Sequence, residues 1–208
     1  MDQGVRAVWY DLPEQGRDEF LQWLHEDHLP KVLQFPGIAW AAHYEIPGGD
    51  NNVSFHDKLN RPEDDAVGTG SQFIVMAGAT TPHVFFDPSP AQIAEGETTA
   101  YQEMASRRIG VRPCIFSEVV RIDGPEAGQR LAGTTPGPAI QMGSFRTSTV
   151  EEEMDAGAWY TQYRLPAIAK MPGAIGARRL ACIAGWPKRG VLYEYTSLEA
   201  RLEHFQQH

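Results

Sequence analysis

Two stretches with the same spacing of Trp, Leu-Pro and Pro-Gly decide the fold of this chain. The first, Trp23–Gly37, reads WLHEDHLPKVLQFPG, and the second, Trp159–Gly173, reads WYTQYRLPAIAKMPG. In both, a Trp is followed by five residues, Leu-Pro, five more residues and Pro-Gly, and the copies lie 136 positions apart. Such a repeat indicates an internally duplicated chain. The copies differ in chemistry, because His28 of the first corresponds to Arg164 of the second.

Hydrophobic periodicity around the first copy alternates between strand and helix. Apolar residues at every second position predict strands, and apolar residues three and four apart predict helices. The expected order is strand 5–12, helix 17–34, strands 38–46 and 72–79, helix 90–108 and strand 111–123. The second copy repeats this order with strand 139–147, helix 151–171, strands 174–184 and 190–196, and a short helix 197–205.

Two segments rich in Gly, Pro and polar residues interrupt this order. The loop 47–71 follows the second strand, and because a loop this long in a compact domain is more often functional than accidental, we expect it to act as a lid. The connector 124–138 falls between the copies. The predicted domains are a first repeat at 1–123, a linker at 124–138 and a second repeat at 139–208.

The predicted order of elements fixes the fold class. A β-α-β-β-α-β unit is a ferredoxin-like fold, in which two helices cover one face of the sheet and the other face needs a partner. We therefore predict an α+β protein of two tandem ferredoxin-like repeats, whose antiparallel sheets pack as a pseudo-symmetric α/β barrel.

Composition excludes several partners. The formal net charge of -9 argues against nucleic acid, since binding a phosphate backbone needs clustered Lys and Arg. The N-terminal sequence lacks the features of a signal peptide, and no apolar run approaches the ~18 residues of a membrane span, so we expect a cytoplasmic protein with no membrane partner.

One sequence pattern carries a family resemblance. Phe20-x2-Trp23-x4-His28-x-Pro30-x5-Pro36-Gly37, placed on the first helix of a ferredoxin-like unit, resembles the EthD-like branch of the dimeric α/β-barrel superfamily. That superfamily contains polyketide cyclases, cofactor-free and haem-dependent oxygenases, decarboxylases, isomerases of ring-cleavage products and members without known activity. The resemblance implies a role in the catabolism of methoxylated or lignin-derived aromatics, and it allows a homodimer.

The candidate catalytic residues lie on the first helix. At about 100° per residue, His28 falls in the middle of the apolar stripe, between Leu24 and Leu21, and both Asp27 and His25 fall at its edges. All three are expected to approach a cavity between helix and sheet. An imidazole beside a carboxylate transfers protons near neutral pH. The alternative is a packed histidine at the helix end.

The candidate substrate-binding residues are spread over both copies. Arg164 shares an apolar stripe with Tyr160, and a guanidinium there is costly unless it meets an anion, either a substrate carboxylate or an internal acid. On strand 38–46, Trp40 and Tyr44 share a face, where Tyr44 either packs or donates to an oxyanion. Arg121 is a further anion candidate.

These residues favour a cofactor-independent enzyme that acts on a small carboxylate. His28, assisted by Asp27 or His25, would isomerise an unsaturated ring-cleavage product or hydrolyse its methyl ester, with Arg164 holding the carboxylate. No metal is expected, because His25 and His28 have no second ligand cluster. Two alternatives stay open: a barrel that binds a small ligand without turnover, as in a stress response, and a haem-dependent oxygenase.

Overall fold

A computed structural model of the chain describes residues 2–47, 66–129 and 136–205. Most of the loop 47–71 and the middle of the connector 124–138 lie outside these residues, so the lid is still a prediction. The chain forms two compact units, residues 1–115 and 116–208. The division falls inside strand β4, and the domain bounds 1–123, 124–138 and 139–208 stay predictions. No helix in the described ranges is long and apolar enough to cross a membrane.

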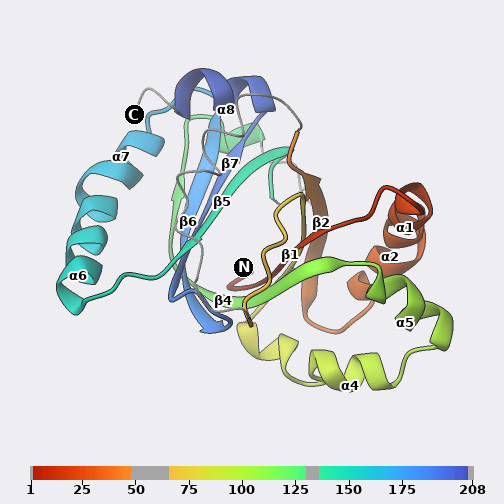
Figure 1. Ribbon diagram of the computed structural model, residues 1–208. Helices are drawn as coiled ribbons and strands as arrows, with labels where there is room; N and C mark the ends of the chain where they lie inside the picture. The colour runs from red at the N-terminus through yellow and green to blue at the C-terminus, as the bar shows by residue number, and fades with distance from the viewer. Residues whose placement is uncertain (1, 48–65, 130–135, 206–208) are drawn as a thin grey trace. The chain divides into compact units, whose positions relative to one another are not determined.

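The first unit alternates strands and helices in the predicted order (Figure 1). Its strands are ordered β2-β3-β1-β4, and β1 and β2 each pair antiparallel with β3. The expected helix 90–108 is two helices, because α4 ends at Gly96 and the Thr98 side chain caps α5. The elements are β1 (Gly4–Asp11), α1 (Arg17–Trp23), a π-helical turn η1 (Leu24–His28), α2 (Leu29–Leu33), β2 (Ile38–Glu45), β3 (Phe73–Ala79), a 3-10 helix η2 (Pro82–Phe85), α4 (Pro90–Glu95), α5 (Thr99–Ser106) and β4 (Ile109–Asp123).

The second unit uses the end of β4 and is ordered β4-β6-β7-β5, with β5 and β6 each antiparallel to β7. Its helix α6 starts with a capping box, in which Thr149 and Glu152 satisfy each other's backbone N–H groups. The chain is therefore α+β with antiparallel strand pairs, as predicted. The elements are η3 (Ala127–Gln129), β5 (Ala139–Phe145), α6 (Val150–Trp159), a π-helical turn η4 (Tyr160–Arg164), α7 (Leu165–Ile168), β6 (Ala174–Ala184), β7 (Arg189–Tyr195) and α8 (Leu198–His204).

The Leu-Pro dipeptide of each repeated stretch coincides with a π-helical turn. Pro30 has no N–H, and in an α-helix its ring would collide with the carbonyl four residues earlier. The helix widens just before it, so that the Leu29 N–H bonds to the Leu24 carbonyl, five residues back. In the second unit Leu165, which precedes Pro166, bonds to the Tyr160 carbonyl in the same way. The proline then occupies the first turn of the following helix, where no N–H is needed.

The Pro-Gly dipeptide ends each helical segment. Gly37 has φ 87° and Gly173 has φ 76°, in the left-handed region that favours glycine. A Cβ at Gly37 would also lie 2.8 Å from Val84, and one at Gly173 would lie 2.5 Å from Ala200. Close packing against the following segment therefore requires glycine at both sites, as the repeated pattern suggests.

Each unit has its own apolar core. In the first, Phe20 of α1 and Leu24 of η1 pack against Tyr10 of β1 and Phe73 of β3. In the second, α7 packs against β6 and β7, and the buried residues are Leu165, Ile168, Met171, Ala174, Ala177, Val191, Tyr193 and Tyr195.

The second unit also buries an ion pair. Arg178 and Glu194 are both 0% exposed, and the Arg178 Nε donates to a Glu194 oxygen at 3.2 Å. The other Glu194 oxygen accepts a hydrogen bond from the Gly137 backbone at 3.1 Å. The fold therefore holds a cation and a carboxylate inside it as one network, in which Arg178 also lies 3.9 Å from the Glu118 carboxylate.

Replacing Glu194 by Gln should destabilise the chain strongly, because it leaves the buried Arg178 only the more distant Glu118 carboxylate, at 3.9 Å, which also pairs with Arg121. We expect a loss of about 3–5 kcal/mol in the free energy of unfolding, measured by urea titration. Glu19→Gln is the matched control, since its pair with Arg107 is exposed on the Glu19 side and should cost less than about 1 kcal/mol. Equal effects of the two substitutions would contradict this account.

Candidate functional site

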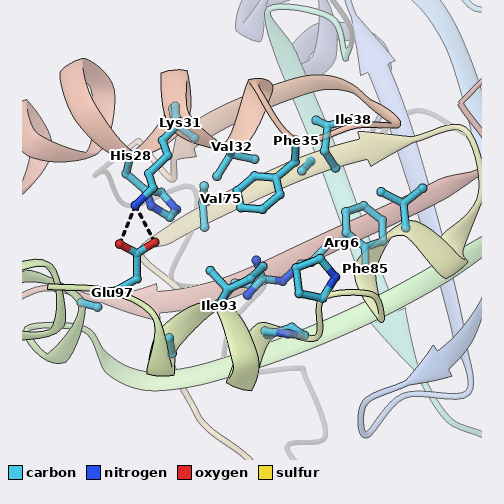
Figure 2. A pocket seen from close by; sticks show the side chains of 18 of the residues that line it. Arg6, His28, Lys31, Val32, Phe35, Ile38, Val75, Phe85, Ile93 and Glu97 are labelled. Carbon is cyan, nitrogen blue, oxygen red and sulfur yellow. Dashed lines mark hydrogen bonds and ion pairs between the residues drawn. The ribbon is translucent and has the colours of Figure 1, made fainter.

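A cavity of about 300 Å³ lies between the helices and the sheet of the first unit. Its lining comes from β1, β3, α2, η2, α4 and α5, and most of it is apolar. Figure 2 shows Val32 and Phe35 on one side of this space and Ile93 on the other. This volume is at the lower end of the range for small-molecule sites, about 300–1,000 Å³. The cavity therefore suits a compact apolar ligand.

His28 lines this cavity, as predicted, and is bonded to a residue that the sequence did not suggest. Its Nδ1 shares a hydrogen bond of 2.6 Å with the Tyr101 hydroxyl of α5, and the tautomer decides which atom donates. The His28 ring also stacks on Trp23, with ring centroids 5.3 Å apart. The Tyr101 ring meets Trp23 edge-on at 5.2 Å. The imidazole is thus held in one orientation.

The surroundings keep His28 neutral. Burial lowers its pKa to about 4, and the positive charges of Arg108, Arg6 and Lys31 lower it in the same direction. Burial and the Glu97 carboxylate raise the pKa of Tyr101, while Arg108 and Arg6 oppose that rise. Both partners are therefore uncharged near neutral pH. A neutral imidazole can accept a proton, which an imidazolium cannot.

Three cationic side chains line the same cavity. Lys31 of α2 forms an ion pair with Glu97, at 2.7 Å and 2.5 Å from its two oxygens, and Figure 2 shows this pair beside His28. Arg6 projects from β1, and Arg108 lies between α5 and β4. Burial lowers the pKa of both guanidinium groups, and Arg108 lowers that of Arg6 further. The cavity is apolar in bulk but electropositive at its polar groups.

The other two predicted catalytic residues do not line the cavity. Asp27 and His25 are exposed, although they flank His28 in sequence. The prediction assumed a constant 100° per residue, but each residue of a π-helical turn rotates by less, so the turn at Leu24–His28 changes the phase. The two residues lie apart from the dyad of His28 and Tyr101, and their catalytic role stays a prediction.

His25 takes part in a different hydrogen-bonded chain. Its Nε2 bonds to Nδ1 of His43 on β2 at 3.0 Å, and Nε2 of His43 bonds to the Tyr10 hydroxyl at 2.8 Å. Burial, followed by the proximity of His25, lowers the pKa of His43 to about 4. These contacts tie the π-helical turn to β2 and β1. The chain of hydrogen bonds from His25 through His43 to Tyr10 therefore has a structural role.

Trp40 and Tyr44 point away from this cavity. They alternate on β2 with His43, which pairs with the cavity-lining Val75, and neither contributes to the lining. The Trp40 Nε1 instead donates to the buried Asp2 carboxylate at 2.6 Å. The shared face of Trp40 and Tyr44 was expected, but their role in binding stays a prediction.

The predicted residues of the second unit, Arg164 and Tyr160, pack against other side chains of that unit. Arg164 is 6% exposed, lies 4.2 Å from the Phe205 ring centre and donates from Nε to the Tyr193 hydroxyl at 3.4 Å. The Tyr160 ring lies under Arg179, at 4.9 Å. No carboxylate among the described residues forms an ion pair with Arg164, so its role as a substrate clamp stays a prediction.

Arg121 already has an anionic partner. Its Nη2 and Nε donate to one oxygen of Glu118 at 2.7 Å and 2.9 Å. This internal pair accounts for the charge that made Arg121 a candidate for binding a substrate anion, although the assignment itself is untested.

Sequence reasoning missed Tyr101, Arg6 and Arg108. Arg6 did carry a signal, since it is a cation on an otherwise apolar strand and shares a face with Val8 and Tyr10. Tyr101 and Arg108 carried none, because they reach the cavity only through the packing of α5. In the described ranges, no group of three or more His, Cys, Asp or Glu side chains is placed to hold a metal ion.

Comparison with known proteins shows the fold of the chain. Neither a family model nor a curated protein matches the sequence. Among solved structures, an anthrone oxidase-like protein has a TM-score of 0.60 at 11% identity, covering 100% of this chain and 78% of its own. A proposed monooxygenase from Lactobacillus acidophilus has a TM-score of 0.53 at 10% identity, covering 98% and 81%. A proposed chlorite dismutase has a TM-score of 0.51 at 14% identity, covering 98% and 84%.

These neighbours share the fold of this chain, which supports the predicted α+β class with antiparallel strand pairs. They do not show the EthD-like branch. Because all three are far below 25% identical to this chain, the likeness extends to the fold and not to the reaction.

The neutral state of His28 should make the chain sensitive to acid. Its pKa is about 4 in the folded chain and near 6.5 when unfolded, so the unfolded state takes up the proton first as the pH falls. The contribution of His28 to the free energy of unfolding is complete above about pH 6.5 and is lost progressively towards pH 4. Urea titrations across this window should show a smaller loss of stability for His28→Gln than for the wild type.

His83→Gln provides the control, because His83 is an exposed residue of η2. The loss of stability of the His83→Gln variant with falling pH should match that of the wild type. An NMR titration in which the His28 ring signal moves near pH 6.5 would contradict the buried, neutral assignment.

Proposed function

We propose that the first unit is a small-molecule enzyme in which His28 transfers protons inside the described cavity. The observation that carries this proposal is the hydrogen bond between His28 and Tyr101, within an apolar cavity of about 300 Å³. When Nδ1 carries the proton and donates to Tyr101, the lone pair of Nε2 is free to act as a base. Tyr101 would thus orient the imidazole and assist it in place of Asp27 or His25, the predicted assisting residues.

Two reactions suit a neutral base in such a cavity. In an isomerisation, Nε2 would remove a proton next to a conjugated carbonyl and return it at the other end of the conjugated system, without any co-reactant. In a methyl-ester hydrolysis, the same nitrogen would take a proton from water as the water oxygen attacks the carbonyl, and methanol would leave. An unsaturated, carboxylated ring-cleavage product of aromatic catabolism is a substrate for either reaction.

The names of the structural neighbours favour a second candidate, an oxidation by O2. One neighbour is called anthrone oxidase-like and another a monooxygenase. Such a reaction would also begin with proton removal by His28, and the resulting carbanion or phenolate would pass electrons to O2. An oxygen electrode separates the two candidates, since isomerisation and hydrolysis consume no O2.

Haem, which the resemblance raised, does not fit this cavity. The volume of about 300 Å³ suits small ligands, and a porphyrin with its two propionates is much larger. No step is assigned to haem, and the chain should show no Soret band when haem is added.

We propose in addition that the units are tandem ferredoxin-like repeats. Several features support this idea. The strand order β2-β3-β1 has the same connections as β6-β7-β5, and both π-helical turns precede Leu-Pro. Strands β2 and β6 also shift register at equivalent points, between Ile38 and Trp40 and between Ala174 and Gly176. A duplication would explain why both units share these features.

Deuterium uptake from D2O provides the test of proton transfer. Unsaturated lactones and methyl esters of dicarboxylic acids would be incubated with the protein, and NMR would follow exchange next to the carbonyl and any conversion. His28→Gln should lower kcat and kcat/KM together by a factor of about 10² to 10⁴. Tyr101→Phe should cause a smaller loss in the same direction.

Asp27→Asn and His25→Gln are the matched comparisons, because both residues flank His28 but are exposed. If proton transfer belongs to His28 and Tyr101, these two variants should retain activity. Full activity in a folded His28→Gln variant would end the proposal, and loss of activity in Asp27→Asn alone would return the role to the carboxylate.

A further inference from the structure

Two guanidinium groups of the cavity have no acidic partner in the described part of the chain. No ion pair joins Arg6 or Arg108 to a carboxylate there, and the contacts of Arg108 are the Ala105 carbonyl, 3.1 Å from Nε, and the Tyr10 ring at 5.9 Å. Both side chains are half-buried, and a partly desolvated cation without an anion is less stable than one that pairs with an anion. An anion in the cavity would provide that partner.

The charges around the cavity do not balance. Its lining holds three cations, Arg6, Lys31 and Arg108, and two carboxylates, Asp87 and Glu97. Lys31 and Glu97 neutralise each other in their ion pair. The remaining two guanidinium groups and Asp87 leave one net positive charge beside a neutral His28. A ligand with a single negative charge would complete the balance.

The rest of the lining sets the shape of that ligand. Phe35, Phe85, Ile93 and Val75 surround the space with apolar and aromatic surface. Such walls favour a planar, unsaturated or aromatic body, while planar guanidinium groups match the two oxygens of a carboxylate.

We propose that the cavity binds a monoanionic unsaturated or aromatic carboxylate, with its negative charge held by Arg6 and Arg108. The inference rests on the function proposed above, because it names the ligand class of the same cavity. It moves the carboxylate clamp from Arg164 to two residues of the unit that contains His28. Tyr101 feels the charge of both arginines, so the anion would lie next to the dyad of His28 and Tyr101.

Binding of the anion would also change the base. The charges of Arg108 and Arg6 disfavour a proton on His28. A carboxylate between them offsets that effect, so His28 becomes more basic when the site is filled. Substrate binding would therefore prepare the group that accepts the proton.

The experiment compares trans-cinnamate with cinnamamide, and benzoate with benzamide, by isothermal titration calorimetry. Each pair shares its planar body and differs in the charge of one group. The wild type should bind each carboxylate about ten- to a hundredfold more tightly than its amide. Equal affinities, or no binding of either carboxylate at millimolar concentration, would overturn the proposal without any variant being made.

Variants then assign the preference to its residues. Arg6→Leu and Arg108→Leu should each remove most of the preference for the carboxylate. Arg107→Gln is the matched control: it removes the neighbouring positive charge, but Arg107 pairs with Glu19 and does not line the cavity. A preference that survives in folded Arg6→Leu and Arg108→Leu proteins would overturn the assignment. If the Leu variants do not fold, Arg6→Lys and Arg108→Lys should weaken the preference through loss of the planar fork.

A second readout separates this inference from the proposed enzyme function. In an NMR titration, saturating cinnamate should raise the pKa of His28, and Arg108→Leu should raise it without ligand. If binding depends on the arginines but turnover does not depend on His28, the anion site stands and the proton transfer fails. If turnover depends on His28 but the amides bind as well as the carboxylates, the proton transfer stands and the anion site fails.

Discussion

The prolines at positions 30 and 166 have no backbone N–H, and the placement of the side chains around the cavity depends on how the helix responds. A helix that meets a proline must break, kink or widen. Here it widens by one residue, so the segment continues in nearly the same direction, with Leu29 bonded five residues back instead of four. The wider turn carries His28 to the cavity and leaves Asp27 in solvent. A single missing donor therefore determines which polar side chain of HEDH faces the sheet.

The helix also widens in the second unit, but Arg164 stands there in place of His28. The strand position opposite the helix explains the difference. Ile38 pairs with Ala79 as Ala174 pairs with Tyr195, which makes Ala77 of β3 the counterpart of Tyr193 of β7. A methyl group leaves space beside the helix, whereas the Tyr193 ring fills it and accepts the hydrogen bond from Arg164. Ala77 thus lines the cavity, whereas Tyr193 lies in the buried core of the second unit.

The fold followed from the sequence because its signals are local. Alternation along 38–45 and 174–184, and Pro-Gly at each helix end, depend on neighbouring residues and were read correctly. The site was predicted only in part. His28 emerged from the helical stripe, but its partner Tyr101 lies 73 positions away and meets it only because α5 packs beside α2. Asp27 was misplaced because a π-helical turn leaves no periodic trace in a stretch this short.

The cations around the cavity have two opposing effects, since they weaken His28 as a base and favour the binding of a carboxylate. His28, the proposed base, is half-buried and surrounded by cations, and burial and these charges both lower its pKa and weaken it as a base. In an empty cavity this is a disadvantage, yet the same cations give a carboxylate its strongest contacts, and apolar walls keep water from screening them. The ligand's own charge then relieves the cations and strengthens the base. If His28 transfers protons as proposed, its chemistry would begin only after an anion has entered the cavity, because the anion is what makes the base stronger.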